Sequence, residues 1–203
     1  MQATPEPVTS SARLSRVWVV GSCGAGKTTT ARRIAEILET QSVHIDEFLW
    51  LPKWKLRERE EMLAMVEDRL AGEAWVMEGN LRRDARRLWQ IVDRAELVVW
   101  LDLPFRLTWL RIARRSLTRS LLRRSCCNGN YETLRRAFFS RKSMLLYAFK
   151  TRRLRALIYS RLLASRRHIR LRTPAEVAGF IEALSLAGSG VLAHPNEEPR
   201  HQG

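Results

Sequence analysis

The chain has 203 residues, which suits one folded domain and is too short for two of ordinary size. Hydrophobic residues make up 45% of it, so a normal core can form, yet no apolar stretch approaches the roughly 20 residues that a membrane span needs. The net charge of +15 is unevenly spread, because residues 103–173 hold 18 Arg and 2 Lys against a single acid, Glu132. Such a segment favours polyanions: nucleotide phosphates, a nucleic-acid backbone or an acidic membrane surface.

The two ends of the chain and the cysteines indicate the bounds of the folded domain and the compartment of the protein. Residues 1–13 and 188–203 are polar, and we expect them to be disordered tails around one domain over residues 14–187. The first dozen residues lack the basic start and apolar run of a secretory signal. Three cysteines, Cys23, Cys126 and Cys127, give no disulfide framework and no zinc-ligand spacing. We therefore expect a cytoplasmic protein with free thiols.

Short apolar runs alternate with segments of helical periodicity over the first half of the domain. Apolar runs of this length that end at glycine or an acid are typical of buried parallel strands. Residues 27–39 show the helical pattern, with an apolar face made of Ala31, Ile34, Ala35 and Leu38. The predicted strands are residues 16–20, 42–45, 74–77 and 97–101, and the predicted helices are 27–39, 56–71 and 81–92.

The second half begins with a long arginine-rich helix, predicted over residues 104–122. Turn residues at 125–130 (SCCNGN) end it, and further helix follows over residues 131–164 in two or three pieces. The last elements are a strand over 168–171 and a helix over 174–186 with proline in its first turn. Strands that alternate with helices predict an α/β domain with a mostly parallel sheet.

The segment GSCGAGKT, residues 21–28, fits the phosphate-loop pattern G-x-x-x-x-G-K-[ST] in full. Glycines let successive N–H groups turn toward phosphate oxygens, Lys27 would reach the β and γ phosphates, and the Thr28 hydroxyl would ligate Mg²⁺. A chance glycine-rich turn is the alternative, but a predicted strand before the loop and a helix after it favour ATP and Mg²⁺ as ligands. The predicted nucleotide-binding residues are Gly21, Ser22, Cys23, Gly24, Ala25, Gly26, Lys27, Thr28 and Thr29.

Three acids follow predicted strands: Asp46, Glu78 and Asp102. In an open parallel sheet, ligands bind beyond the carboxyl ends of the strands. A hard cation seeks oxygen ligands, so we predict Glu78 and Asp102 as supports for Mg²⁺. The alternative for each acid is a loop residue or a helix cap, and Asp102 stands just before a proline-led helix.

Motifs at these strand ends resemble the adenylate-kinase-related P-loop proteins, notably the bacterial group called DNA topology modulation proteins. The motifs are His44-Ile45-Asp46 followed by Trp50 and Trp54, then VMEGN at 76–80, VWLDLP at 99–104 and NGNYE at 128–132. The resemblance spans residues 16–184. It implies a P-loop NTPase fold, with a five-stranded sheet flanked by helices and an Arg-rich helical lid over about residues 105–165.

Adenylate kinases themselves resemble the chain more loosely. Their D-G-[FY]-P-R element corresponds to residues 78–82, which implies Glu78 as the acid on the Mg²⁺ side and Arg82 as a clamp for the acceptor. Their lid-base arginines correspond to Arg111 and Arg115, which would neutralise the transferring phosphoryl group. The chain departs from these kinases at Leu49, where they have the arginine of an Asp-x-x-Arg pair, so the acceptor stays open.

Two functions follow from the sequence. The first is a phosphotransferase that moves the ATP γ-phosphate to a small acceptor, such as a nucleoside monophosphate; its predicted catalytic residues are Lys27, Asp46, Arg111 and Arg115. Asp46, Trp50 and Arg82 are the predicted acceptor-binding residues, although Trp50 and Trp54 could equally pack over a loop. The second function is an ATP-dependent nucleic-acid-binding or DNA-topology-modulating regulatory protein, with residues 106–172 as its basic face. A solvated face whose Arg stems cover apolar side chains is the simpler interpretation of that segment.

Overall fold

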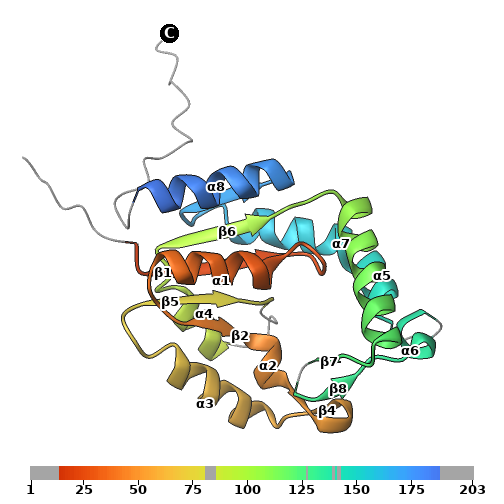
Figure 1. The fold of residues 1–203 in the computed structure, drawn as a ribbon. Helices are drawn as coiled ribbons and strands as arrows, with labels where there is room; N and C mark the ends of the chain where they lie inside the picture. Colours follow the sequence, from red (N-terminus) through yellow and green to blue (C-terminus); the bar gives the residue numbers. More distant parts are fainter. Residues whose placement is uncertain (1–13, 81–85, 127, 139, 141–142, 188–203) are drawn as a thin grey trace, which may run out of the picture.

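A five-stranded sheet forms the centre of the molecule (Figure 1). The computed structural model describes residues 14–80, 86–126, 128–138, 140 and 143–187. All neighbouring strands of the sheet are parallel, in the order β2-β5-β1-β6-β9, so the predicted α/β fold is confirmed. The strands are β1 (Arg16–Gly21), β2 (Ser42–His44), β5 (Trp75–Glu78), β6 (Leu97–Leu101) and β9 (His168–Leu171).

Helices cover both faces of this sheet, which gives three layers (Figure 1). Helices α1 (Lys27–Ile37) and α8 (Pro174–Leu186) pack together on one face. Helices α3 (Arg59–Arg69) and α4 (Arg86–Val92) cover the other face, together with the end of α7 (Met144–Leu162). Because both faces are buried, every residue of β6 is apolar and buried, as expected for a central parallel strand.

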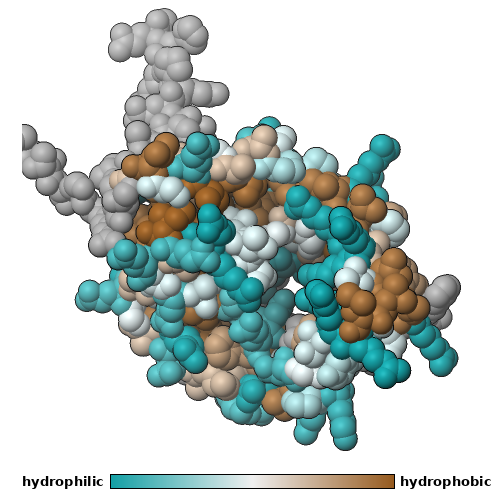
Figure 2. Space-filling view, in the orientation of Figure 1, coloured by the Kyte–Doolittle hydropathy of each residue, from teal (hydrophilic) through white to brown (hydrophobic). Residues whose placement is uncertain are grey.

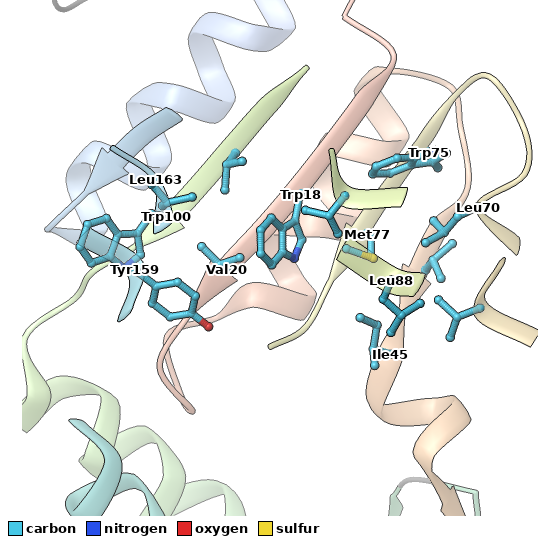
Figure 3. Packing of buried hydrophobic residues seen from close by; sticks show 14 of the residues in the cluster. Trp18, Val20, Ile45, Leu70, Trp75, Met77, Leu88, Trp100, Tyr159 and Leu163 are labelled. Carbon is cyan, nitrogen blue, oxygen red and sulfur yellow. The ribbon is translucent and has the colours of Figure 1, made fainter. Parts of the chain in front are cut away.

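The central strand β1 divides its side chains between the two faces. Val17 and Val19 join the core under α1 and α8, whereas Trp18 and Val20 join the core under α3 and α4 (Figure 3). The Trp18 ring is fully buried, and such burial contributes about 4–6 kcal/mol. Its Nε1 donates to the carbonyl oxygen of Gly79 at 3.1 Å, so the ring also fixes the chain just after β5.

The predicted lid region, residues 105–165, consists of helices and a small hairpin beside the carboxyl end of the sheet (Figure 1). The helix predicted over 104–122 is confirmed as α5 (Phe105–Leu121), which packs against α7. The helical stretch predicted beyond it is confirmed as two pieces, α6 (Leu134–Phe138) and α7. Within the described part of the chain, no helix is both long and apolar enough to cross a membrane.

Several short elements escaped the sequence prediction. The strand predicted over 42–45 ends at His44, and a short helix α2 (Ile45–Leu49) follows it at once. Next come β3 (Trp50–Leu51), a 3₁₀ turn η1 (Pro52–Trp54) and β4 (Lys55–Leu56), the two strands pairing as a hairpin. In the lid region, β7 (Ser125–Cys126) and β8 (Asn130–Tyr131) form a second hairpin where only turn residues were predicted. Elements of two residues are too short to show any periodicity in a sequence.

Helix boundaries differ from the predictions for local reasons. The helix predicted from residue 56 begins at Arg59, because the Glu58 carboxylate caps it by accepting the backbone N–H of Glu61 at 2.9 Å. The helix predicted over 81–92 is described from Arg86 onward. Residues 81–85 lie outside the described part of the chain, as do the predicted tails 1–13 and 188–203.

Candidate functional site

The loop after β1 curls around the amino end of α1. Gly24 and Gly26 take left-handed backbone angles, with φ of +76° and +95°, and Gly26 is the residue just before the helix. The Ala25 N–H donates to the Ser22 carbonyl oxygen at 3.2 Å, which closes a tight turn. Lys27 Nζ donates to the same carbonyl oxygen at 3.2 Å, so the ammonium group lies across the loop. Loop N–H groups, a helix amino end and a lysine together form a place for an anion.

Gly24 has no room for a side chain. A Cβ at this position would lie 2.3 Å from the backbone oxygen of Thr108 in α5, so the loop packs directly against that helix. Gly129, in the β7–β8 turn, has the same kind of backbone angle, φ +77°, but nothing within 4 Å of its Cβ position.

These two glycines give a matched prediction. Gly24→Ala is expected to lower the free energy of unfolding by about 2–4 kcal/mol, because strain and overlap add. Gly129→Ala is expected to lower it by about 1–2 kcal/mol, from the backbone angle alone. Urea denaturation of both variants measures the difference, and equal losses would show that the close approach of the loop to α5 does not matter.

Glu78, the last residue of β5, points at the first turn of α1. Only 4% of its surface is exposed, and its Oε1 accepts the Thr28 hydroxyl at 2.9 Å. Burial alone would raise the pKa of Glu78, but the polar contact with His44, the charge of Lys27 and the bond from Thr28 outweigh burial and lower that pKa. The carboxylate therefore stays ionised. Mg²⁺ typically takes one or two protein oxygens and completes its shell with phosphate and water, so Thr28 and Glu78 fit such an ion.

His44 holds the Glu78 carboxylate from the other side. Its Nδ1 lies 3.3 Å from Glu78 Oε1, and its Nε2 receives the Nε–H of Arg32 at 3.3 Å. A guanidinium only donates, so the Nε2 atom must accept, which leaves the ring proton on Nδ1, the nitrogen nearer to the carboxylate. His44 stands in the motif quoted above, but only the fold reveals it as a partner of Glu78.

Asp102, predicted as a support for Mg²⁺, pairs with an arginine in this structure. Arg170 in β9 donates to Asp102 Oδ2 through both Nε, at 2.9 Å, and a terminal nitrogen, at 2.6 Å. The same guanidinium lies 4.2 Å from the centre of the Trp100 ring. Asp102 is thus neutralised by an arginine that joins β9 to β6, whereas Glu78 faces Thr28.

Asp46 lies in the first turn of α2, two residues after the end of β2 at His44, and its side chain is exposed to solvent. Burial by surrounding protein raises the pKa of Asp46; the charges of Lys27, Arg155 and Arg115 lower that pKa but do not outweigh burial. The negative charge of Glu78 also raises the pKa of Asp46. Five ionisable groups from four helices and one strand therefore converge on one cleft, and Figure 2 shows hydrophilic residues along the hollow between the sheet and the lid helices.

Arg155 in α7 is a site residue that the sequence did not single out from the many arginines around it. Its guanidinium donates to the Tyr147 hydroxyl at 2.8 Å and bonds the side chain of Asn80. With the amide of Asn80 oriented to satisfy its neighbours, the amide nitrogen also donates to the Gly21 carbonyl oxygen at 3.0 Å and to the Tyr159 hydroxyl. Arg155 is thus attached to the base of the phosphate loop, and no spacing rule in the sequence could have predicted this tertiary contact.

A cavity of about 330 Å³ adjoins the phosphate loop. Its size falls within the range of small-ligand pockets, about 300–1,000 Å³. Arg111 lies at its edge, with a terminal nitrogen 3.8 Å from the Cβ position of Gly26. The cavity is lined by Ala25, Gly26, Thr29, Thr30, Leu103, Arg111, Pro174 and Val177. A larger cavity of about 630 Å³ lies among α5, α6 and α7, but the described residues of its lining are mostly apolar and include no ionisable group.

Trp50 and Arg82 were the other residues predicted to bind the acceptor, and Trp54 was the predicted neighbour of Trp50. Trp50 and Trp54 meet edge to face, with ring centres 5.5 Å apart, and the indole Nε1 of Trp54 donates to the Tyr131 carbonyl oxygen at 3.1 Å. Contacts between the β3–β4 and β7–β8 hairpins therefore explain part of the position of Trp50 and Trp54. Arg82 lies outside the described residues. Cys23 packs beside the small apolar cluster of Ile112, Leu145 and Ala148.

Comparison with known proteins adds information on the fold. No protein-family model matches the chain, and neither does any curated protein sequence. A shikimate kinase from Acinetobacter baumannii, solved with shikimate, has a TM-score of 0.55 and 17% identity over 85% of this chain and 92% of that one. A shikimate kinase from Bacteroides thetaiotaomicron has a TM-score of 0.54 and 14% identity over 85% and 97%. A gluconokinase from Sinorhizobium meliloti 1021 has a TM-score of 0.48 and 17% identity over 87% and 92%. The two shikimate kinase matches thus show that the chain has the kinase-like α/β fold of those structures.

Proposed function

We propose that the protein is a phosphotransferase that moves the γ-phosphate of ATP to a small molecule bearing a hydroxyl group. The observation that carries this proposal is the convergence of Asp46 with Lys27, Glu78, Arg115 and Arg155 beside the phosphate loop. A carboxylate among cations suits an acceptor hydroxyl that must lose a proton, whereas a phosphate acceptor needs no base. The similar structure solved with shikimate supports a small acceptor.

In the proposed reaction, each residue of the cleft has one task. The phosphate loop and Lys27 bind the β and γ phosphates, and Arg111 borders the cavity for the nucleoside. Thr28 and Glu78 would hold Mg²⁺, which neutralises charge on the phosphates. Arg115 and Arg155 stabilise the charge that develops on the transferring group.

The transfer itself needs one bond formed and one broken. Asp46 accepts the hydroxyl proton while the acceptor oxygen bonds to the γ-phosphorus. The bond from that phosphorus to the oxygen it shares with the β-phosphate breaks, and the electron pair leaves with ADP. Trp50 and Arg82 remain proposed contacts of the acceptor.

The test of this function is ATP consumption by the purified protein against a panel of nucleosides, small alcohols, hydroxy acids and nucleoside monophosphates. We expect one hydroxyl-bearing class to speed ATP turnover at least about a hundredfold over ATP alone. A monophosphate as the only active acceptor would leave Asp46 without its proposed task. Tight ATP binding with no active acceptor in the panel would count against the kinase proposal as a whole.

Two isosteric substitutions distinguish the roles of Glu78 and Asp102, the two candidate acids on the metal side. Glu78→Gln is expected to lower turnover about 10²-fold and to raise the Mg²⁺ concentration needed for half-maximal rate, because a charge next to Thr28 is lost. Asp102→Asn removes the same charge at the Arg170 pair and is expected to lower stability more than turnover. A Mg²⁺ titration of the rate and a urea titration measure the two effects. The reverse ranking would move the metal-side role to Asp102.

A second candidate function is ATP-dependent nucleic-acid binding or regulation, and membership of the DNA topology modulation group belongs with it as a proposal. It is supported by the solvent exposure of many arginines on α5 and α7 and next to them. The exposed residues include Arg106, Arg114, Arg123, Arg124, Arg153 and Arg161. Binding of this kind would fall steeply with salt, since it would rest on backbone phosphates. A salt titration of DNA and RNA binding with and without ATP tests it.

A further inference from the structure

The two short hairpins, far apart in the sequence, are hydrogen-bonded to each other. Asn128, in the turn between β7 and β8, donates its amide N–H groups to the carbonyl oxygens of Glu47 and Trp50, both at 2.7 Å. Asn130, in β8, uses both ends of its amide on the other hairpin. Its Oδ1 accepts the Trp54 backbone N–H at 2.6 Å, and its Nδ2 donates to the Leu51 carbonyl oxygen at 2.9 Å.

These bonds are specific. Only 2% of the surface of Asn130 is exposed, so its amide is committed to backbone atoms of the hairpin opposite. A buried amide that satisfies a donor and an acceptor at once fixes the relative position of both segments, because a shift would leave buried polar atoms unpaired. The bond from Trp54 Nε1 to the Tyr131 carbonyl adds a contact in the other direction. Figure 1 shows β7 and β8 beside β4 and α2.

The two joined segments belong to opposite walls of the cleft. Residues 47–56 follow Asp46 directly, and in the proposed function they form the wall on the acceptor side. Residues 125–131 continue from α5, which carries Arg111 and Arg115 on the nucleotide side. The asparagines therefore connect the segment that would orient the acceptor to the helix that would neutralise the transferring phosphate.

We propose that Asn128 and Asn130 are positioning residues that make these two walls a single closing unit, so that ATP bound on the phosphate loop also orders the acceptor side. The inference rests on the proposed function. It also gives a role to the Asn-Gly-Asn motif at residues 128–130, which takes no part in the proposed reaction. ATP that draws α5 toward its phosphates would draw residues 47–56 with it. The acceptor would then meet a preformed wall, which lowers the entropy that its binding must offset.

The experiment is hydrogen exchange of the full chain, with and without a non-hydrolysable ATP analogue and Mg²⁺. In the wild type, the analogue is expected to slow exchange at residues 21–30, which bind it, and also at residues 47–56, which do not. Asn128→Gly removes the amide while keeping a residue that tolerates the φ of +61° at this position. Asn130→Asp keeps the acceptor for Trp54 N–H but loses the donor to Leu51. In both variants the slowing at 47–56 is expected to disappear while that at 21–30 remains.

A second readout does not depend on ATP. Without the analogue, exchange over residues 47–56 is expected to be up to about tenfold faster in the variants, which is the effect of losing one hydrogen bond. Gln41→Ala is the matched control, since its amide bonds the Arg69 carbonyl oxygen at the end of α3, outside both hairpins. It should leave exchange at 47–56 unchanged.

The possible results separate the inference from the function on which it builds. Wild-type exchange over residues 47–56 in both asparagine variants would overturn the inference, whatever the analogue does. Slowing at 21–30 alone in the wild type would also overturn it, because binding would then not reach the acceptor wall. An analogue that slows exchange nowhere in the wild type would instead refute the proposed ATP site, and basal exchange would still decide whether the asparagines join the walls.

Discussion

Lys27→Ala is expected to reduce ATP turnover with the active acceptor at least about a hundredfold. Lys27 Nζ now rests on the Ser22 carbonyl oxygen, within the loop where the β and γ phosphates would bind. Its ammonium charge would neutralise the oxygen between the β and γ phosphates while the γ-phosphoryl group is transferred, and alanine carries no such charge. Steady-state rates over a range of ATP concentrations separate lost binding from lost transition-state stabilisation.

The control for Lys27 is Arg33→Ala. Arg33 lies on the same helix, is exposed and pairs with Glu36 at 2.8 Å, so its loss removes one positive charge from α1 outside the loop. Such a surface pair contributes little to stability, and turnover should stay within about twofold. A comparable loss of activity in both variants would mean that the general positive potential, and not the position of Lys27, drives the reaction.

Asp46→Asn is expected to reduce turnover by about 10²–10⁴-fold, the usual contribution of a general base. An amide keeps the shape of the side chain but cannot take up the proton of an acceptor hydroxyl. Because the pKa of Asp46 is raised by burial, the wild-type rate is expected to fall with decreasing pH earlier than an ordinary aspartate would cause. That acid limb should be absent from the residual activity of the variant.

Asp46→Asn is expected to preserve or raise the stability of the protein, although it lowers the activity. A raised pKa means that the folded protein holds a proton at Asp46 more tightly than the unfolded chain does, so its contribution to stability falls as pH rises between the two values. Asp46→Asn should therefore unfold at an equal or higher urea concentration at neutral pH. Glu47→Gln, an exposed neighbour on α2, should change neither activity nor stability appreciably. A loss of stability in Asp46→Asn would identify Asp46 as a structural residue.

The sequence was sufficient to predict the sheet and the loop conformation over residues 21–28. Residues 21–28 form one continuous motif whose spacing reflects its geometry, and strands such as β6 are apolar from end to end because both sheet faces are buried. The pairing of Glu78 with Thr28 was foreseeable, since both lie at ends of elements that meet in any parallel sheet of this kind.

The tertiary contacts around this motif could not be predicted in the same way. Arg155 is one of many arginines in a basic stretch, and only the packing of α7 brings it to Asn80. The contact of His44 with Glu78 and the pairing of Asp102 with Arg170, 68 residues away, likewise depend on the fold. Contacts of this kind depend on which segments fold onto each other, and local patterns carry no information about that.

The hydrogen bonds between the two hairpins also connect the elements around the cleft into a ring. The sheet, α5, the β7–β8 hairpin, the β3–β4 hairpin and α2 follow one another as a closed ring of elements, joined by the chain and by the bonds of Asn130 (Figure 1). A long polymer could not pass through such a ring without separating Asn130 from Leu51. In the proposed function, the ring would therefore sort substrates by size: small molecules, or the free end of a chain, would reach Asp46, and the interior of a long strand would not.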